Sequence, residues 1–415
     1  MKVNYGSKEV ELNIPEDNLC FNLYPRECSR INNVKEEILN AIRNPIGCPS
    51  LQKIMDSQDK VVIIADDNTR LTPVNIIISV LLDELNHIEV KDKNIKLVIA
   101  GGSHRPMSSN EILKRFGKDI LSRIKVAPHN YKENLVDYGV TKRDTRIWIN
   151  REVMQADIRI GVGSILPHLP AGWAGGAKIV LPGVAGKDSV DQLHLLGACD
   201  PTVELGKVET SFRAEIEEFA TKIGLHFIVN TIFDKNGNIV KVVAGHFMKA
   251  HRKGVEHARE VFQVKCKEKA DITISSTYPV DYDFFQADKG IFSAVLATKE
   301  GGEIVLLSPC YEGIGPHADQ FINLANLDTL EILDRIRKGK IEDVMGASEV
   351  VLLNSMRDKC KVTIVSEGLS EVEVKKMGCR YVPLLCLQDI INRCLKSDLR
   401  IGVVHQSAEI FPKCS

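Results

Sequence analysis

Eight short runs of apolar, mostly β-branched residues recur along the chain, and within each run few polar residues intervene. They stand at residues 60–67 (KVVIIADD), 94–102 (NIKLVIAGG), 156–164 (ADIRIGVGS), 225–233 (LHFIVNTIF), 270–277 (ADITISST), 302–309 (GEIVLLSP), 361–368 (KVTIVSEG) and 399–405 (LRIGVVH). Nearly continuous apolar runs are typical of central strands that are covered on both faces. The pattern therefore predicts buried strands.

Segments with helical character lie between these runs. They cover residues 75–87, 110–116, 208–223, 245–262, 318–337, 341–353 and 388–394. Strands that alternate with helices predict an α/β fold with mainly parallel sheets flanked by helices.

The charged segment at 264–272 (VKCKEKADI) offers the clearest boundary in the chain. We expect an N-terminal α/β domain over residues 1–267 and a C-terminal α/β domain over residues 268–415. The first would carry a glycine-rich loop and the second would contribute substrate-binding residues. The active site is expected in the crevice between them.

Charge and composition exclude several classes of protein. The 415 residues are 44% apolar, and 54 basic residues balance 55 acidic ones to a formal net charge of −1. Such a chain has no overall attraction to nucleic acid or to acidic membranes. The polar N-terminus lacks the apolar segment of a signal peptide, and no apolar run approaches the roughly 20 residues of a membrane span. We expect a cytoplasmic protein that binds neither nucleic acid nor membranes.

The eleven cysteines are scattered, odd in number and free of any C-x-x-C pair. A disulfide framework is typical of short secreted chains with regular cysteine spacing. We therefore expect most of these cysteines to be small core residues.

Polar and glycine-rich segments follow four of the predicted strands, at residues 66–70, 101–105, 167–178 and 277–289. Ligands of open α/β sheets bind beyond the carboxyl ends of the strands. We expect the four segments to share one crevice.

The longest of these segments belongs to residues 161–194, which contain seven glycines and three prolines together with His168, Lys178 and His194. Glycine lets backbone N–H groups approach an anion closely, so phosphate binding is the first hypothesis. The dinucleotide fingerprint and the P-loop both fail, because Leu166 and Leu181 stand where each motif needs glycine. The alternative is a glycine-rich connector with a surface lysine and two structural histidines.

Two loops near the N-terminus carry further candidates. Arg70 suits a bidentate grip on a carboxylate, and Asp67 suits the orientation of a histidine. The alternative is a helix cap and a surface ion pair. His104 and His168, on different strand ends, are two candidate bases, as the inversion of a stereocentre requires.

Three more residues complete the candidate set. Lys178 lies among glycines and apolar residues, where loss of water would make its amine nucleophilic. Gln286 and Lys289 are one helical turn apart, and we expect them to hold a polar substrate.

Taken together and in this order, these stretches resemble the nickel-pincer lactate racemase family. The resemblance rests on D-x-T-R-x-x-P at 67–73, G-x-H-R-P at 102–106, H-x-x-A-G-x-x-G-G-x-K at 168–178, V-L-P-G at 180–183, His194, and Q-A-x-K-G at 286–290. It covers nearly the whole chain.

The resemblance implies a cofactor. Members of the family carry nickel in a pyridinium-derived mononucleotide with two sulfur arms, one joined to a lysine that matches Lys178. His194 matches the protein ligand of the nickel, and imidazole with sulfur donors suits that metal. The glycine loop, with Gly172, Gly175 and Gly176, would bind the cofactor. Separate maturation enzymes supply it, so they are expected partners.

The resemblance also implies a reaction. A histidine takes the hydroxyl proton of a 2-hydroxy acid while the α-hydrogen leaves as hydride, and hydride return to the opposite face inverts the centre. His104 and His168 would be the two catalytic bases. Arg70, Gln286 and Lys289 would bind the substrate, and Asp67 would support a base from behind.

Two departures from the family bear on the substrate. The residues beside Lys178 are Ala177 and Ile179, where lactate racemases of the family have Arg and Ser. The region 341–348 lacks the tryptophan of their substrate pocket. We therefore expect a racemase or epimerase of a 2-hydroxy acid other than lactate.

Two other classes of protein stay open. One is a non-catalytic protein of the same fold that binds a hydroxy acid or a nucleotide. The other is a zinc hydrolase that uses His104, His168 and His194, although the sequence offers no evident carboxylate ligand for it.

Overall fold

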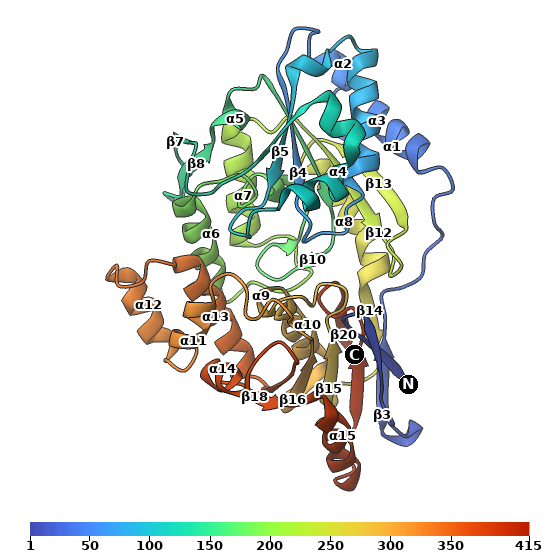
Figure 1. Cartoon of the computed structure of the whole chain (residues 1–415), viewed down its shortest axis with the longest axis vertical. Coiled ribbons are helices and arrows are strands. Elements are labelled where there is room, and N and C mark those ends of the chain that lie inside the picture. Colours follow the sequence, from blue (N-terminus) through green and yellow to red (C-terminus); the bar gives the residue numbers. More distant parts are fainter. Residues whose placement is uncertain (415) are drawn as a thin grey trace.

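Two six-stranded sheets, one in each half of the molecule, organise the chain (Figure 1). The structure is a computed structural model that describes residues 1–414. In the first sheet, neighbouring strands are parallel except for the antiparallel pair of β13 and β12. Its strands in spatial order are β13 (Ile239–Gly245), β12 (Phe227–Phe233), β9 (Ile158–Ser164), β4 (Val61–Asp66), β5 (Ile95–Ala100) and β6 (Lys125–Pro128).

The second sheet is parallel throughout. Its strands in spatial order are β18 (Arg380–Val382), β17 (Lys361–Val365), β16 (Thr298–Leu307), β15 (Ala270–Ser276), β19 (Ile401–Val404) and β3 (Leu19–Leu23). The predicted fold class, α/β with mainly parallel sheets flanked by helices, is confirmed.

Helices cover both faces of each sheet. The helices of the first half are α1 (Val34–Arg43), α2 (Leu51–Ile54), α3 (Val74–His87), α4 (Ser109–Arg123), α5 (Arg151–Met154), α6 (Lys187–Cys199), α7 (Ser211–Ile223) and α8 (Lys249–Phe262). Those of the second half are α9 (Phe284–Ala287), α10 (Lys289–Ala297), α11 (Ala318–Leu324), α12 (Thr329–Arg337), α13 (Val344–Arg357), α14 (Glu371–Lys376) and α15 (Leu387–Lys396). Within residues 1–414, none of the helices has the length and apolar character needed to cross a membrane.

The central strand β4 is apolar over its first five residues because both of its faces are covered. Ile63 packs in the core shared with α3 and α4, whereas its neighbour Ile64 packs in the core on the opposite face with α6 and α7. All six residues of β4 are buried. A strand between two helical layers has no solvent face, so alternation with polar residues disappears.

The predicted helices are confirmed in place, with corrections to their ends. The segment predicted as one helix at 318–337 forms two, α11 and α12, separated where Asp328 caps the second. The helix predicted at 245–262 begins only at Lys249, because β13 extends to Gly245. The helix predicted at 110–116 continues to Arg123 through a kink at Gly117.

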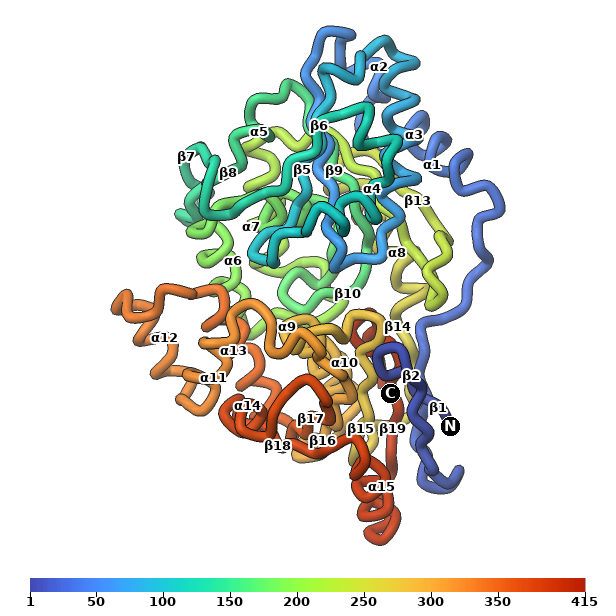
Figure 2. The backbone as a smooth tube through the Cα atoms, in the orientation of Figure 1, coloured from blue at the N-terminus to red at the C-terminus, as the bar shows by residue number. Residues whose placement is uncertain are grey.

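The N-terminal segment of the chain lies beside its C-terminal segment (Figure 2). The hairpin of β1 (Lys2–Tyr5) and β2 (Lys8–Glu11) precedes β3, which pairs with β19 in the second sheet. The chain then crosses to the first sheet. The predicted division at residue 267 assigns β3 to the first domain, whereas its pairing assigns it to the second sheet. The division into 1–267 and 268–415 is otherwise a prediction.

Small elements complete the fold. The paired strands outside the sheets are β7 (Leu135–Val140) with β8 (Arg146–Asn150), β10 (Pro167–His168) with β11 (Gly172–Trp173), and β14 (Gln263–Cys266) with β20 (Phe411–Cys414). The 3-10 helices are η1 (Glu16–Asn18), η2 (Asp92–Asn94), η3 (Gly176–Ile179) and η4 (Leu384–Cys386).

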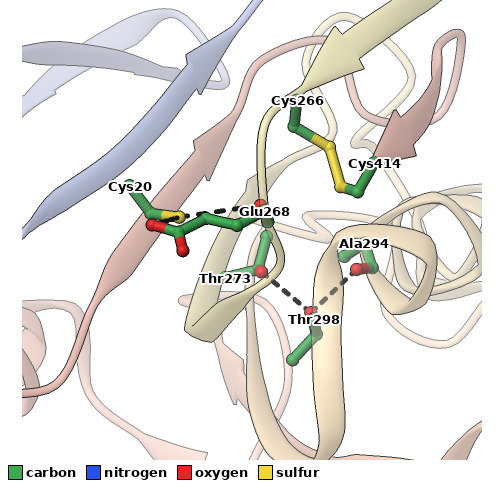
Figure 3. The surroundings of a disulfide bond; sticks show 7 residues. All are labelled: Cys20, Cys266, Glu268, Thr273, Ala294, Thr298 and Cys414. Carbon is green, nitrogen blue, oxygen red and sulfur yellow. Dashed lines mark hydrogen bonds between the residues drawn. A yellow bond between two sulfur atoms is a disulfide. The ribbon is translucent and has the colours of Figure 1, made fainter.

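One disulfide joins Cys266 at the end of β14 to Cys414 at the end of β20 (Figure 3). The other nine cysteines are free. The expected absence of a disulfide framework did not anticipate this single bond. Its cysteines are 148 residues apart, and spacing along the chain cannot reveal a pair that only the alignment of β14 with β20 brings together.

We expect the exchange of Cys414 for Ser to destabilise the protein by about 2–4 kcal/mol, because a disulfide across a long loop restricts the unfolded chain. Urea unfolding without reductant measures the effect. Cys20→Ser is the matched control, since Cys20 lies nearby as a free thiol. Reductant should lower the parent midpoint to that of Cys414→Ser and leave the variant unchanged. Equal midpoints for parent and variant without reductant would contradict the prediction.

Candidate active site

One cavity between the two halves collects the loops that follow four strands. The loops after β4, β5 and β9 reach it from the first sheet, and the segment after β15 reaches it from the second. Figure 1 shows the short strand β10 at the side of the first half that meets the second. The shared crevice expected from the sequence is thus present. The predicted residues that line it are Asp67, Arg70, His104, His168, Gly175, Lys178, His194 and Lys289.

His104 forms a partly buried pair with Asp67. Its Nδ1 lies 2.8 Å from Oδ2 of Asp67, a carboxylate that is 4% exposed. Burial lowers the pKa of His104, and the Asp67 charge acts in the opposite direction. The imidazole is therefore largely neutral at pH 7. With Nδ1–H donated to Asp67, Nε2 keeps its lone pair, as a general base requires.

Asp67 is held in its ionised form. Burial alone would raise its pKa, but His104 and the Thr69 hydroxyl outweigh burial, and the pKa lies below its ordinary value. The expectation that Asp67 orients a histidine agrees with this contact. Asp67 does not cap a helix, because α3 begins after Pro73 without a side-chain cap.

Arg70 faces the cavity without an acidic partner among the described residues. One nitrogen of its guanidinium donates to the Thr69 carbonyl at 2.9 Å and to the Thr69 hydroxyl at 3.0 Å. The alternative of a surface ion pair does not hold in this structure. The remaining N–H groups can receive a carboxylate in two parallel hydrogen bonds.

His168 stands on β10, opposite Gly172 of β11. Its Nδ1 is buried and has no hydrogen-bond partner in the structure. Burial and the nearby Lys178 charge hold the pKa of His168 well below its ordinary value. A buried polar atom without a partner is uncommon, and one at the wall of a cavity points to a ligand.

Lys178 lies on η3, partly buried at the cavity wall. Its amine makes no hydrogen bond or ion pair to any residue from 1 to 414. Burial, together with Arg70 and Lys289, lowers the pKa of Lys178 well below its ordinary value. A lysine in this state is nucleophilic. Lys178 is therefore not an exposed lysine on a surface connector.

Three residues that the sequence did not single out hold the loop before Lys178. The buried guanidinium of Arg213 donates to the carbonyls of Ala171, Trp173 and Gly175. His251 lies 2.9 Å from the Ala174 carbonyl through Nε2, and the Asn230 side chain accepts the Gly176 N–H at 2.8 Å. Successive backbone groups of the loop are thus fixed, which fixes the position of η3.

The three predicted glycines differ in position. Gly175 lines the cavity, whereas Gly172 and Gly176 do not. Gly172 has φ +69°, and a Cβ there would lie 1.6 Å from the Lys207 carbonyl oxygen. Gly176 has φ +61° and packs against His251. These two glycines permit close packing of the loop, which accounts for them without a bound phosphate.

His194 projects from α6 into the cavity, with its Nδ1 2.7 Å from the Val190 carbonyl. Burial lowers the pKa of His194 to about 4, so the ring is neutral at pH 7. The hydrogen bond places the proton on Nδ1 and leaves Nε2 as an electron-pair donor. This is the arrangement that a metal-binding histidine adopts.

Gln286 and Lys289 contact each other, as their spacing predicted. The Lys289 amine donates to the Gln286 side-chain carbonyl across the junction of α9 and α10. Lys289 lines the cavity, whereas Gln286 is buried behind it. Burial lowers the pKa of Lys289. Gln286 therefore does not line the cavity itself and acts on it only by binding the Lys289 amine.

No cluster of three or more His, Cys, Asp or Glu side chains suited to a metal ion occurs in residues 1–414. His104, His168 and His194 do not converge as the zinc hydrolase alternative requires. A metal that takes most of its ligands from a cofactor needs only one protein ligand, and His194 is available for that role.

Several cavity residues were not singled out from the sequence. The second half contributes Phe285, Asp288, Phe292, Met345 and Glu349. One signal was available for Glu349, which is an acid directly before the apolar run Val350–Leu353 on a helix that the sequence predicted.

Comparisons with known proteins agree with one another. Two family models match, the lactate racemase N-terminal domain over residues 5–206 and the lactate racemase C-terminal domain over residues 265–406. The lactate racemase of Thermoanaerobacterium thermosaccharolyticum is 30% identical, with 91% of this chain and 90% of that protein covered. The lactate racemase of Lactiplantibacillus plantarum is 29% identical, with 80% of each covered.

Solved structures give the same picture of the fold. The lactate racemase apoprotein from Thermoanaerobacterium thermosaccharolyticum has a TM-score of 0.88 at 26% identity, with 99% of both chains covered. A protein from Thermotoga maritima has a TM-score of 0.72 at 17% identity, with 94% of this chain and all of that chain covered. The second likeness concerns the fold alone.

Proposed function

Because the chain belongs to the lactate racemase family, we propose that it racemises or epimerises a 2-hydroxy acid with a nickel-pincer nucleotide held at Lys178. One observation is the main support for this proposal. The unpaired amine of Lys178, the histidines His104, His168 and His194, and the guanidinium of Arg70 all meet in one cavity.

The donor groups of this chain fit the cofactor. The amine of Lys178, whose pKa is lowered, would hold the cofactor through the thioamide link, and Nε2 of His194 offers a neutral imidazole to nickel. Arg213, His251 and Asn230 support the loop before Lys178. When bound, the cofactor would supply an acceptor for the α-hydrogen as hydride.

The remaining residues would bind substrate and move its hydroxyl proton. Arg70 would grip the carboxylate, and Lys289, supported by Gln286, would bind a substrate oxygen. His104 or His168 would take the hydroxyl proton from one enantiomer, and the other histidine would return a proton to form the opposite one. The pairing with Asp67 supports His104 as a base, because the carboxylate stabilises the imidazolium that forms. A protein that only binds its ligand has no need of this pair.

The comparisons give no support to the expectation that lactate is not the substrate, since both curated relatives are lactate racemases. The cavity does contain Met345, from the region that lacks the tryptophan of the family's pocket. Lactate therefore belongs in the substrate panel together with larger 2-hydroxy acids. Maturation enzymes as partners and a cytoplasmic location stay predictions.

The proposed function is tested by co-expression with cofactor-maturation enzymes and a chiral assay of single enantiomers deuterated at the α-carbon. The expected product is the opposite enantiomer with its deuterium retained, because the hydrogen returns from the cofactor without exchange with water. Wash-out of the deuterium would indicate a proton-transfer racemase. A nickel-loaded protein that inverts none of the acids would contradict the proposal.

The exchange of His194 for Ala should lower the nickel content of the matured protein along with its activity, because it removes the only proposed protein ligand. Metal analysis measures this directly. His87→Ala is the control, since His87 is exposed at the end of α3. Nickel content equal to that of the parent would exclude the ligand role of His194.

A further inference from the structure

The side of the cavity formed by the second half carries two carboxyl groups that the proposed reaction does not use. Asp288 stands at the junction of α9 and α10, and Glu349 stands on α13. Both line the cavity with Arg70, Lys178 and Lys289. Elements far apart in the sequence thus bring two acids to a site that also holds three cationic side chains.

Asp288 is 2% exposed, and its Oδ2 is buried without a hydrogen-bond partner. Lys289, its neighbour in the chain, donates instead to Gln286. Burial raises the pKa of Asp288 well above its ordinary value, and Glu349 raises it further. A buried carboxyl oxygen at a cavity wall without a partner calls for a donor from a ligand.

Glu349 also lacks a partner, although it is less buried than Asp288. It forms no hydrogen bond or ion pair within the part of the chain that the structure describes, although it is only partly exposed. Burial raises its pKa. The two acids therefore form an acceptor-rich wall, next to the apolar side chains of Phe292 and Met345.

We propose that Asp288 and Glu349 form a subsite for hydrogen-bond donors on the far end of the substrate, so that the preferred 2-hydroxy acid carries a hydroxyl or ammonium group beyond its α-carbon. The subsite rests on the proposed function and specifies its substrate class. A purely apolar tail would leave both carboxyl groups without partners. A second carboxylate carries no hydrogen-bond donor at neutral pH and is disfavoured.

The test uses matured, nickel-loaded protein and pairs of acids of equal size. Glycerate is compared with 2-hydroxybutyrate, which replaces the terminal hydroxyl by methyl, and 4-amino-2-hydroxybutyrate is compared with 2-hydroxypentanoate. Malate tests a second carboxylate, and lactate serves as the reference. The measured quantity is kcat/KM for racemisation. The first pair reports on a hydroxyl donor and the second on an ammonium donor.

We expect one donor-bearing acid to exceed its apolar match by about 10- to 100-fold, because the apolar match leaves a buried carboxyl group without a partner. In Glu349→Leu and Asp288→Ala, which remove the acceptor oxygens, this preference should fall at least about tenfold while kcat/KM for the apolar match changes little. Glu331→Gln, an exposed acid on α12, is the control.

Several results would overturn the subsite. One is equal kcat/KM for the two acids of each pair, and another is malate as the best substrate. A third is an equal loss of kcat/KM on all acids in the two variants, which would indicate that the carboxyl groups only balance the charge of the site. If a variant fails to fold, the parent panel alone still decides. A nickel-loaded parent that inverts lactate but shows no donor preference contradicts the subsite and leaves the proposed function intact. A nickel-loaded parent that inverts no acid contradicts both.

Discussion

Replacement of Lys178 by alanine is expected to abolish racemisation by the matured protein, with a loss of at least about 10⁴-fold. Lys178 supplies the only proposed covalent attachment of the cofactor, and the rate acceleration of about 10⁶-fold or more that enzymes reach would depend on it here. The same variant should lack the sulfur-containing mass adduct.

The large expected effect follows from the environment of the Lys178 amine. Its amine has no partner within the described residues, and burial together with neighbouring cations keeps it uncharged more readily than an exposed lysine. Lys253→Ala is the matched control, because Lys253 lies on the exposed side of α8 in an ion pair with Glu256. A Lys178→Ala protein that racemises at the parent rate would exclude the attachment.

Exchange of either His104 or His168 for Asn should lower kcat by at least the roughly 10²- to 10⁴-fold that a positioned general base contributes. A racemase uses one base in each half of the cycle, so neither histidine can replace the other. Nickel content should stay at the parent level, because neither residue is a proposed ligand. Chiral assays started from each enantiomer measure the loss.

Asp67→Asn provides a graded comparison for His104. An amide in place of the carboxylate keeps the shape of the side chain but no longer stabilises an imidazolium, and we expect a loss of about 10- to 100-fold, as for other residues that orient a functional histidine. His87→Asn controls for histidine exchange as such. Full activity in either His104→Asn or His168→Asn would contradict the two-base mechanism.

The sequence predicted the strands of the sheet centres and missed those at the edges. The eight apolar runs correspond to β4, β5, β9, β12, β15, β16, β17 and β19, which are the eight inner strands of the two sheets. The four edge strands, β3, β6, β13 and β18, were not predicted. An edge strand has one neighbour and meets solvent, so polar residues interrupt its apolar pattern, as Lys241 does in β13 (IVKVVAG).

The sequence predicted those candidate residues that lie directly after the end of a strand. His104, His168 and Arg70 belong to that group, and the shared crevice follows from the parallel sheet. Arg213 could not be found in this way, because an arginine on a helix indicates solvent exposure unless the carbonyls that surround it are known. Asp288 and Glu349 come together only when α10 and α13 meet across the cavity, and no spacing along the chain encodes that meeting.

Helices α6 and α10, which carry His194 and Lys289, were also not predicted as helices. Six residues of α6 are buried, including Ser189 and Asp191, so polar residues stand on its inner face. A helix whose inner face carries polar side chains lacks the apolar stripe on which the prediction depends. Residues at a cavity wall face a ligand and need not follow the pattern of a core.

The most direct test of the account is mass analysis of the parent protein after maturation, combined with its nickel content. Intact mass should show one sulfur-containing adduct per chain, peptide mapping should locate it on the peptide with Lys178, and metal analysis should find about one nickel per chain. A sample that racemises a 2-hydroxy acid while Lys178 is unmodified and nickel is absent would contradict the account.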